Sequence, residues 1–183
     1  MPGNIEIKAR VDEMAELRRR AEGLADSGPM VIRQSDTFFE CPRGRLKLRV
    51  IDGDAGELIH YHRPDTAGPC RSDYRIVRVP EPAALREALE RAWGVLGVVD
   101  KERTLYHAGQ TRIHLDRVAG LGDFMELEVV LRNGQDPADG AAVAKDLMAR
   151  LGISPADLVD RAYLDLLLEG GLGAGPRSSS SRA

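Results

Sequence analysis

Charged residues recur at every second position in several short segments of this chain. The groups are Glu6/Lys8/Arg10, Arg45/Lys47/Arg49, Lys101/Arg103, Arg112/His114/Asp116 and Glu126/Glu128. Because alternate residues of a β-strand point to the same face, each group presents its charges on one side of a strand. Lysine and arginine bind phosphates, and carboxylates bind Mg²⁺ or Mn²⁺, which prefer oxygen ligands. The pattern therefore predicts a site for a polyanion together with a divalent cation.

The same charges could instead form the solvated outer faces of an ordinary open sheet. For one strand this explanation is the simpler one, since antiparallel sheets often expose one polar face. Five segments with the same two-residue spacing favour a shared lumen. A dry lumen with so many charges would be strongly destabilising, so we expect it to be wet.

The lysines support this interpretation. Basic residues in this chain are overwhelmingly arginine, and the lysines are only Lys8, Lys47, Lys101 and Lys145. Three of these four fall in the alternating segments. Lysine carries a compact ammonium group, so its retention there is consistent with a need for that group in the lumen.

Hydrophobic periodicity predicts the elements that position these charges. Strands are predicted over 4–10, 32–39, 44–51, 57–63, 72–79, 98–106, 110–117 and 124–131, and helices over 12–25, 82–93, 137–151 and 155–168. We expect Asp12 and Ser154 to cap helices, and Trp93 to be buried. The short connections favour an antiparallel sheet, so the fold class is α+β. Helices would cover the apolar faces opposite the charges.

Composition limits the class of protein. The chain has 183 residues, a formal net charge of −3 and two cysteines, Cys41 and Cys70. We expect a cytoplasmic protein with reduced thiols and no signal peptide, membrane segment or nucleic-acid partner. Residues 1–169 are predicted to form one domain. The Gly/Ser-rich residues 170–183 are predicted to form a disordered tail.

An ordered set of motifs resembles the CYTH superfamily, which contains class IV adenylyl cyclases and thiamine-triphosphatase-type enzymes. The motifs are NIEIK at 4–8, RLKLR at 45–49, YHRPD at 61–65, DKERTLY at 100–106, LDRVAGLGDFMELEVVL at 115–131 and DRAYLDLLL at 160–168. The resemblance covers roughly residues 3–169 and is strongest to the bacterial class IV adenylate cyclase-like branch.

The resemblance implies a closed antiparallel eight-stranded β-barrel, with covering helices, that holds a triphosphate in its tunnel. The implied phosphate-binding residues are Lys8, Arg45, Lys47, Arg49, Arg63, Lys101, Arg103 and Arg112. The implied ligands of Mg²⁺ or Mn²⁺ are Glu6, Glu126, Glu128 and Asp116. The residues implied in catalysis are Glu6, Lys8, Arg63, Lys101 and Arg103.

Asn4 departs from the family pattern, which has a carboxylate at this position. The resemblance favours a cyclase that converts ATP to cyclic AMP and pyrophosphate. Hydrolysis of thiamine triphosphate, a nucleoside triphosphate or tripolyphosphate is the alternative reaction. A non-catalytic triphosphate-binding module is a third hypothesis, which Asn4 favours. A homodimer is left open, and zinc binding by His60 and His62 together with His114 or His107 is a weaker alternative.

Overall fold

The computed structural model of the chain describes residues 3–53, 55–62 and 70–171. Within these residues the strands are β1 (Gly3–Arg10), β2 (Ser27–Phe39), β3 (Arg45–Ile51), β4 (Ala55–His62), β5 (Cys70–Val79), β6 (Val95–Ala108), β7 (Thr111–Val118) and β8 (Gly122–Val130). The α-helices are α1 (Met14–Leu24), α2 (Pro82–Trp93), α3 (Pro137–Leu151) and α4 (Tyr163–Glu169). Arg63 and most of the predicted tail lie outside the described residues.

The strands form a barrel in which every neighbouring pair is antiparallel. The order around it is β1-β5-β4-β3-β2-β6-β7-β8, and β8 pairs again with β1. The β1–β8 pairing extends over seven residues, whereas β1 and β5 pair over only four. The predicted α+β antiparallel barrel is confirmed, but its closure is only partial along the short β1–β5 seam.

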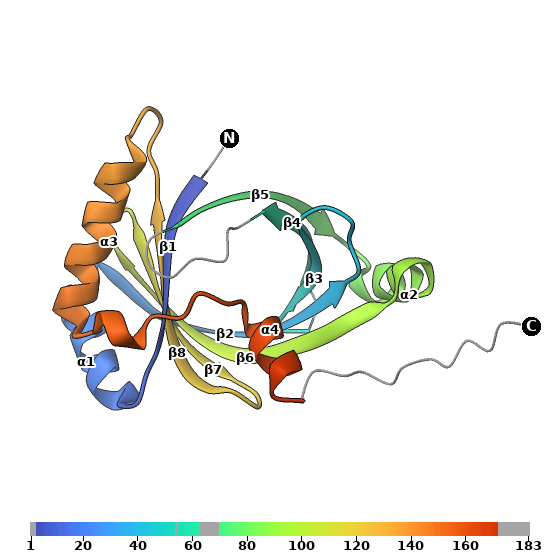
Figure 1. Cartoon of the computed structure of the whole chain (residues 1–183), viewed down its shortest axis with the longest axis horizontal. Helices are drawn as coiled ribbons and strands as arrows, with labels where there is room; N and C mark the ends of the chain where they lie inside the picture. Colours follow the sequence, from blue (N-terminus) through green and yellow to red (C-terminus); the bar gives the residue numbers. More distant parts are fainter. Residues whose placement is uncertain (1–2, 54, 63–69, 172–183) are drawn as a thin grey trace, which may run out of the picture.

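Helices lie against the barrel on two opposite sides (Figure 1), and apolar side chains on its outer face pack against them. Helices α1 and α3 cover β1, β7 and β8, where Ile7 and Leu127 are almost completely buried. On the other side, Leu85 and Leu89 of α2 pack against a cluster that includes Leu48. Because side chains alternate along each strand, burial of these residues turns their charged neighbours into the lumen.

Three local predictions, about a helix cap, a buried side chain and the start of a strand, are wrong. The first helix begins at Met14 after Glu13, and no side-chain hydrogen bond caps it, so Asp12 is not its cap. Trp93 is 49% exposed because it is the last residue of α2, beyond the part that packs on the barrel. The second strand begins at Ser27, several residues earlier than predicted, because it pairs along the length of β6.

The predicted helix over 155–168 is broken. Ser154 does cap a turn, but that turn is a 3₁₀-helix that ends at Asp157. The chain then runs extended: Leu158 bridges Ala9, and the Val159 amide donates to the Lys8 carbonyl at 2.9 Å. This pairing with β1 delays the last helix, so α4 begins only at Tyr163.

No helix among the described residues is both long enough and apolar enough to cross a membrane.

Candidate functional site

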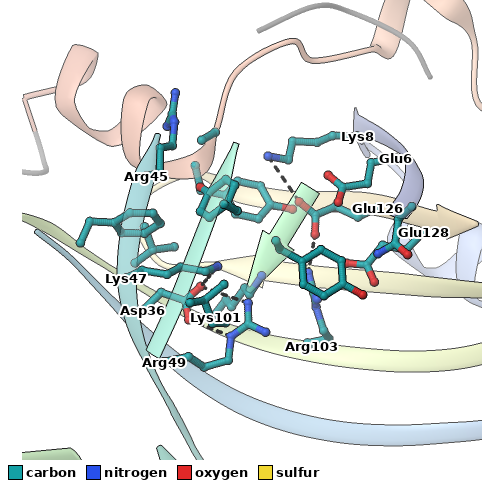
Figure 2. A pocket seen from close by; sticks show the side chains of 18 of the residues that line it. Glu6, Lys8, Asp36, Arg45, Lys47, Arg49, Lys101, Arg103, Glu126 and Glu128 are labelled. Carbon is teal, nitrogen blue, oxygen red and sulfur yellow. Dashed lines mark hydrogen bonds and ion pairs between the residues drawn. The ribbon is translucent and has the colours of Figure 1, made fainter. Parts of the chain in front are cut away.

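The charged inner faces of the strands line a cavity of about 190 Å³ (Figure 2). Ten of the predicted site residues lie around it: Glu6, Lys8, Arg45, Lys47, Arg49, Lys101, Arg103, Arg112, Glu126 and Glu128. They come from β1, β3, β6, β7 and β8, so the barrel brings together side chains that are up to 122 residues apart in the sequence. Among the lining residues, cations outnumber carboxylates, which suits the cavity to a polyanion.

A buried aspartate that the sequence analysis did not single out organises the basic side of the cavity. Asp36 of β2 is 3% exposed and lies beside β3. Its Oδ2 lies 2.7 Å from Lys47 Nζ, and its Oδ1 lies 3.0 Å from Arg49 Nε. Burial alone would raise the pKa of the Asp36 carboxyl, but Lys47 and Arg49 hold it well below its ordinary value. The signal that could have revealed it is that Asp36 is the only acidic residue of β2.

Lys47 has an unusual environment for a lysine. Its Nζ lies 5.5 Å from the centroid of the Phe38 ring and 5.6 Å from that of the Tyr61 ring. Burial and the neighbouring Arg49 lower the pKa of the Lys47 ammonium to about 8, although Asp36 opposes the shift. Lys47 is therefore charged at neutral pH but loses its proton more readily than a surface lysine.

A second buried aspartate, Asp116, forms the floor of the site. Its carboxylate accepts hydrogen bonds from Arg103 at 2.6 Å to each oxygen, from Lys101 at 3.2 Å and from the Tyr163 hydroxyl at 3.0 Å. Burial would raise its pKa, but Arg103 and Lys101 lower it. The Asp116 side chain is completely buried and is not among the residues that line the cavity. Its two oxygens thus contact two cations and a hydroxyl, so Asp116 holds Lys101 and Arg103 in place, and its predicted role as a metal ligand stays a prediction.

The opposite wall of the cavity is acidic and is formed by β1 and β8. The strand register places Glu6 beside Glu128 and Lys8 beside Glu126. Glu126 is bound by Lys8 at 3.3 Å and by Arg103 at 2.5 Å, and Glu128 lies 3.3 Å from Arg112. Although burial would raise the pKa of Glu126, Lys8 and Lys101 lower it well below its ordinary value. Both glutamates thus lie in the cavity among cations, on the side away from Asp36.

His114 of β7 joins these two glutamates. Donor atoms of His114, Glu126 and Glu128 all lie within 4.8 Å of one another, which is close enough for one metal ion to contact all three. Burial and the nearby Arg103 lower the pKa of His114 to about 4, so the ring is neutral near pH 7. A neutral imidazole and two carboxylates are donors that a divalent cation accepts. This part of the site therefore fits a divalent cation.

The C-terminal segment covers one end of the lumen. Tyr163, the first residue of α4, is buried and lines the cavity, and its ring centroid lies 4.0 Å from Lys8 Nζ. Lys8 also donates a hydrogen bond to the Arg161 carbonyl at 3.1 Å. Arg45 forms an ion pair with Asp165 of α4 at 2.8 Å. The sequence pattern does not mark Tyr163 as a site residue, because it predicts a continuous helix over 155–168.

The remaining predicted residues have different positions. Asn4 lies in the cavity wall, and its Oδ1 is buried without a hydrogen-bond partner among the described residues. His60 is exposed and contacts the Arg43 carbonyl at 2.8 Å. The metal-ligand group formed by His114 includes neither His60 nor His62. The zinc alternative therefore has no support in these two histidines.

Comparisons with known proteins agree with this architecture. The structure of PH1012 from Pyrococcus horikoshii OT3 is 28% identical, has a TM-score of 0.80, and the match covers 89% of this chain and 98% of that one. The structure of HpAC1 from Hippeastrum, which has a dominant triphosphatase activity, is 16% identical with a TM-score of 0.65. That match covers 96% of this chain and 98% of HpAC1, and at this identity it shows the fold alone.

A curated relative gives a shorter match. Adenylate cyclase CyaB from Aeromonas hydrophila is 34% identical over 68 residues, which are 37% of this chain and 36% of the relative. The chain thus matches about a third of the length of that protein. The CYTH domain family model, in contrast, matches residues 3–163 and so includes every strand of the barrel. Given this match and a barrel whose lumen carries the paired charges, the chain belongs to the CYTH domain family.

Proposed function

We propose that this protein is a divalent-cation-dependent enzyme that acts on a triphosphate, with ATP cyclisation as its leading reaction. The observation that carries the proposal is the division of one cavity into two halves. Lys47, Arg49 and Lys101 lie around Asp36 on one side, and Glu126 and Glu128 lie on the other (Figure 2). Such an arrangement suits a phosphate chain that has cationic groups along its length and a metal ion at one side.

In this proposal the protein contributes mainly positioning and charge. The cations would hold the β- and γ-phosphates, and Arg103 would keep its guanidinium in place through Asp116. A divalent cation, Mg²⁺ or Mn²⁺, held by Glu126 and Glu128 with Glu6 nearby, would neutralise charge on the phosphates. In the cyclase reaction the ribose 3′-hydroxyl loses its proton to solvent and its oxygen bonds to the α-phosphorus, while the bond from that phosphorus to the bridging oxygen breaks and pyrophosphate leaves.

Hydrolysis is the second candidate reaction, because the same cations that hold the phosphates would also position the γ-phosphorus for attack by water. HpAC1 supports it, since a protein with this fold has a dominant triphosphatase activity. The partial match to adenylate cyclase CyaB supports cyclisation. A non-catalytic triphosphate-binding module is the third candidate. It is favoured by Asn4, whose neutral amide stands where the family pattern has a carboxylate.

Product analysis tests these candidates. We expect the purified protein, supplied with ATP and Mg²⁺ or Mn²⁺, to release cyclic AMP and pyrophosphate in equal amounts. ADP and phosphate would instead support the hydrolase, and the same assay should then include thiamine triphosphate and tripolyphosphate. If the protein binds ATP, thiamine triphosphate or tripolyphosphate but turns over none of them, the result would support the non-catalytic binding module.

Salt dependence tests the cavity itself. Several cations would contact the anion at once, so we expect the affinity for tripolyphosphate, measured by calorimetry without metal, to fall steadily as the NaCl concentration rises. A matched titration with neutral adenosine provides the control, because its affinity should change little. An affinity for tripolyphosphate that does not depend on salt would contradict the proposed site.

A further inference from the structure

His114 belongs to the metal-ligand group and has a buried ring nitrogen that no hydrogen bond satisfies. Its Nδ1 is buried and lacks a hydrogen-bond partner among the described residues, and the residue is 3% exposed. The same atom lies 3.7 Å from Glu128 Oε1, which is too far for a hydrogen bond. Buried polar atoms are usually paired, because leaving one unpaired is costly. An unpaired ring nitrogen directed toward a carboxylate across this gap therefore indicates a missing third partner.

The surroundings of His114 identify the chemistry of that partner. The charged groups that face it are Arg103 from β6, Asp116 from its own strand, and Glu126 and Glu128 from β8. Asp116 is already occupied by Lys101 and Arg103. Glu126 and Glu128 also contact Lys8, Arg103 and Arg112, but one oxygen of each lies within 4.8 Å of a His114 ring nitrogen. A group that accepts electron pairs from one nitrogen and two carboxylates is a metal cation.

We propose that His114 is a nitrogen ligand of the divalent cation bound by Glu126 and Glu128, and that this site selects a first-row transition-metal ion over Mg²⁺. The inference rests on the proposed function in one respect: both place the cation at these glutamates. It goes further in assigning a non-oxygen ligand and, with it, the class of metal.

The selectivity follows from the donor set. Mg²⁺ prefers oxygen donors and commonly keeps several waters, so an imidazole adds little to its binding. Manganese, iron, cobalt and zinc ions accept imidazole nitrogen together with carboxylate oxygen. Loss of the nitrogen should therefore weaken binding of Mn²⁺ more than binding of Mg²⁺.

Mn²⁺ is the probe for the experiment, because it is paramagnetic. The full chain is stripped with a chelator, loaded with Mn²⁺ and measured by pulsed electron paramagnetic resonance, which detects ligand nitrogen through its coupling to the electron spin. We expect a ¹⁴N coupling that changes to a ¹⁵N coupling when the protein is labelled with ¹⁵N-histidine. Calorimetry should also show that the protein binds Mn²⁺ more tightly than Mg²⁺.

Two matched variants assign the signal. His114→Gln retains a polar side chain, should abolish the coupling and should weaken Mn²⁺ binding by about tenfold or more, since loss of even a hydrogen-bonding partner of a metal ligand costs that much. His62→Gln changes an exposed histidine at the end of β4 and should leave both measurements unchanged. Thermal melting of both variants verifies that they are folded.

The outcomes separate this inference from the proposed function. Wild-type protein that binds Mn²⁺ without a histidine nitrogen coupling, or that binds no Mn²⁺, overturns the inference without any variant. Turnover of a triphosphate with Mg²⁺ in that protein would leave the proposed function intact. Conversely, a histidine coupling in a protein that turns over no triphosphate would support the metal site and overturn the enzymatic proposal.

Discussion

Asp116→Asn is expected to lower the free energy of unfolding by about 3–5 kcal/mol, the usual cost of removing one partner from a buried charge cluster. The carboxylate is completely buried and lies against Lys101 and Arg103, which are themselves 4% and 6% exposed in their side chains. An amide of the same size cannot neutralise either cation. Chemical denaturation, monitored by circular dichroism, measures the loss.

Asp123→Asn is the matched control, because it makes the same chemical change on the neighbouring strand β8. Asp123 pairs with Arg117 at 3.3 Å, and the Arg117 side chain is 70% exposed. Exposed ion pairs contribute only about 0–1 kcal/mol, so this variant should be nearly as stable as the wild type. Equal losses in the two variants would mean that Asp116 does not hold the floor of the cavity.

The effect of Asp116→Asn should also depend on pH. The pKa of Asp116 is lower in the folded protein than its ordinary value of 3.8, so its ionised form stabilises the fold fully above that value. This contribution is lost as the pH falls through the lower, folded pKa. The difference between wild type and variant should therefore be constant near neutrality and shrink below about pH 4. If the difference in unfolding free energy between wild type and variant instead grows as the pH falls, that result would contradict a lowered pKa of Asp116 in the folded protein.

Lys47→Met is expected to reduce the affinity for a triphosphate by about 10- to 100-fold, which corresponds to the 1.5–3 kcal/mol of a hydrogen bond to a charged group. The variant keeps the length of the side chain but removes the ammonium from the cavity. Asp36 retains its contact with Arg49 at 3.0 Å, so the fold should survive. Calorimetric titration with ATP measures the change.

Lys145→Met provides the control, since Lys145 is exposed on α3 and is the one lysine of this chain outside the alternating segments. Its replacement removes the same charge from the protein but should leave the affinity for ATP close to that of the wild type. If the two variants lose affinity equally, overall charge rather than the cavity governs binding.

The lowered pKa of Lys47 adds a pH dependence to the same measurement. Because that pKa is about 8, the side chain loses its charge as the pH rises through this value, and affinity for ATP should fall between pH 7 and pH 9. In Lys47→Arg the guanidinium remains charged over this range, so the fall should disappear or move to higher pH. An identical pH profile in wild type and Lys47→Arg would exclude Lys47 as its source.

The two-residue period of the charged segments determined which residues face the lumen. An apolar residue such as Ile7 must be buried under a helix, and this forces Glu6 and Lys8 to the other side of β1. The same reasoning placed the charges of β3, β6 and β8 correctly. Eight alternating segments with short connections also implied an antiparallel sheet. The barrel and most of its lining were therefore predictable, because strand facing is a local property.

The pairing of charges across the lumen was not predictable from that period. Asp116 shares its strand face with Arg112, and both were assigned to the ligand site, yet Asp116 lies beneath the cavity against Arg103. Asp36 was overlooked although it binds Lys47. The alternation determines the face of the strand on which a side chain lies, but it does not determine the position of that side chain along the barrel axis. That position follows from the register between strands, which is set by long-range pairing.

The segment after Ser154 shows the same difference between what the local pattern predicts and what tertiary contacts decide. The helical pattern after Ser154 was detected, as was its cap, but the break between Asp157 and Tyr163 was not. Periodicity reports how a segment would fold alone, whereas this segment exchanges helical hydrogen bonds for contacts with β1 at Leu158 and Val159. That exchange carries the Tyr163 ring over Lys8. The sequence by itself thus determined which faces carry charge, and the tertiary structure decided which charges meet, because partners distant along the chain are selected only when the barrel forms.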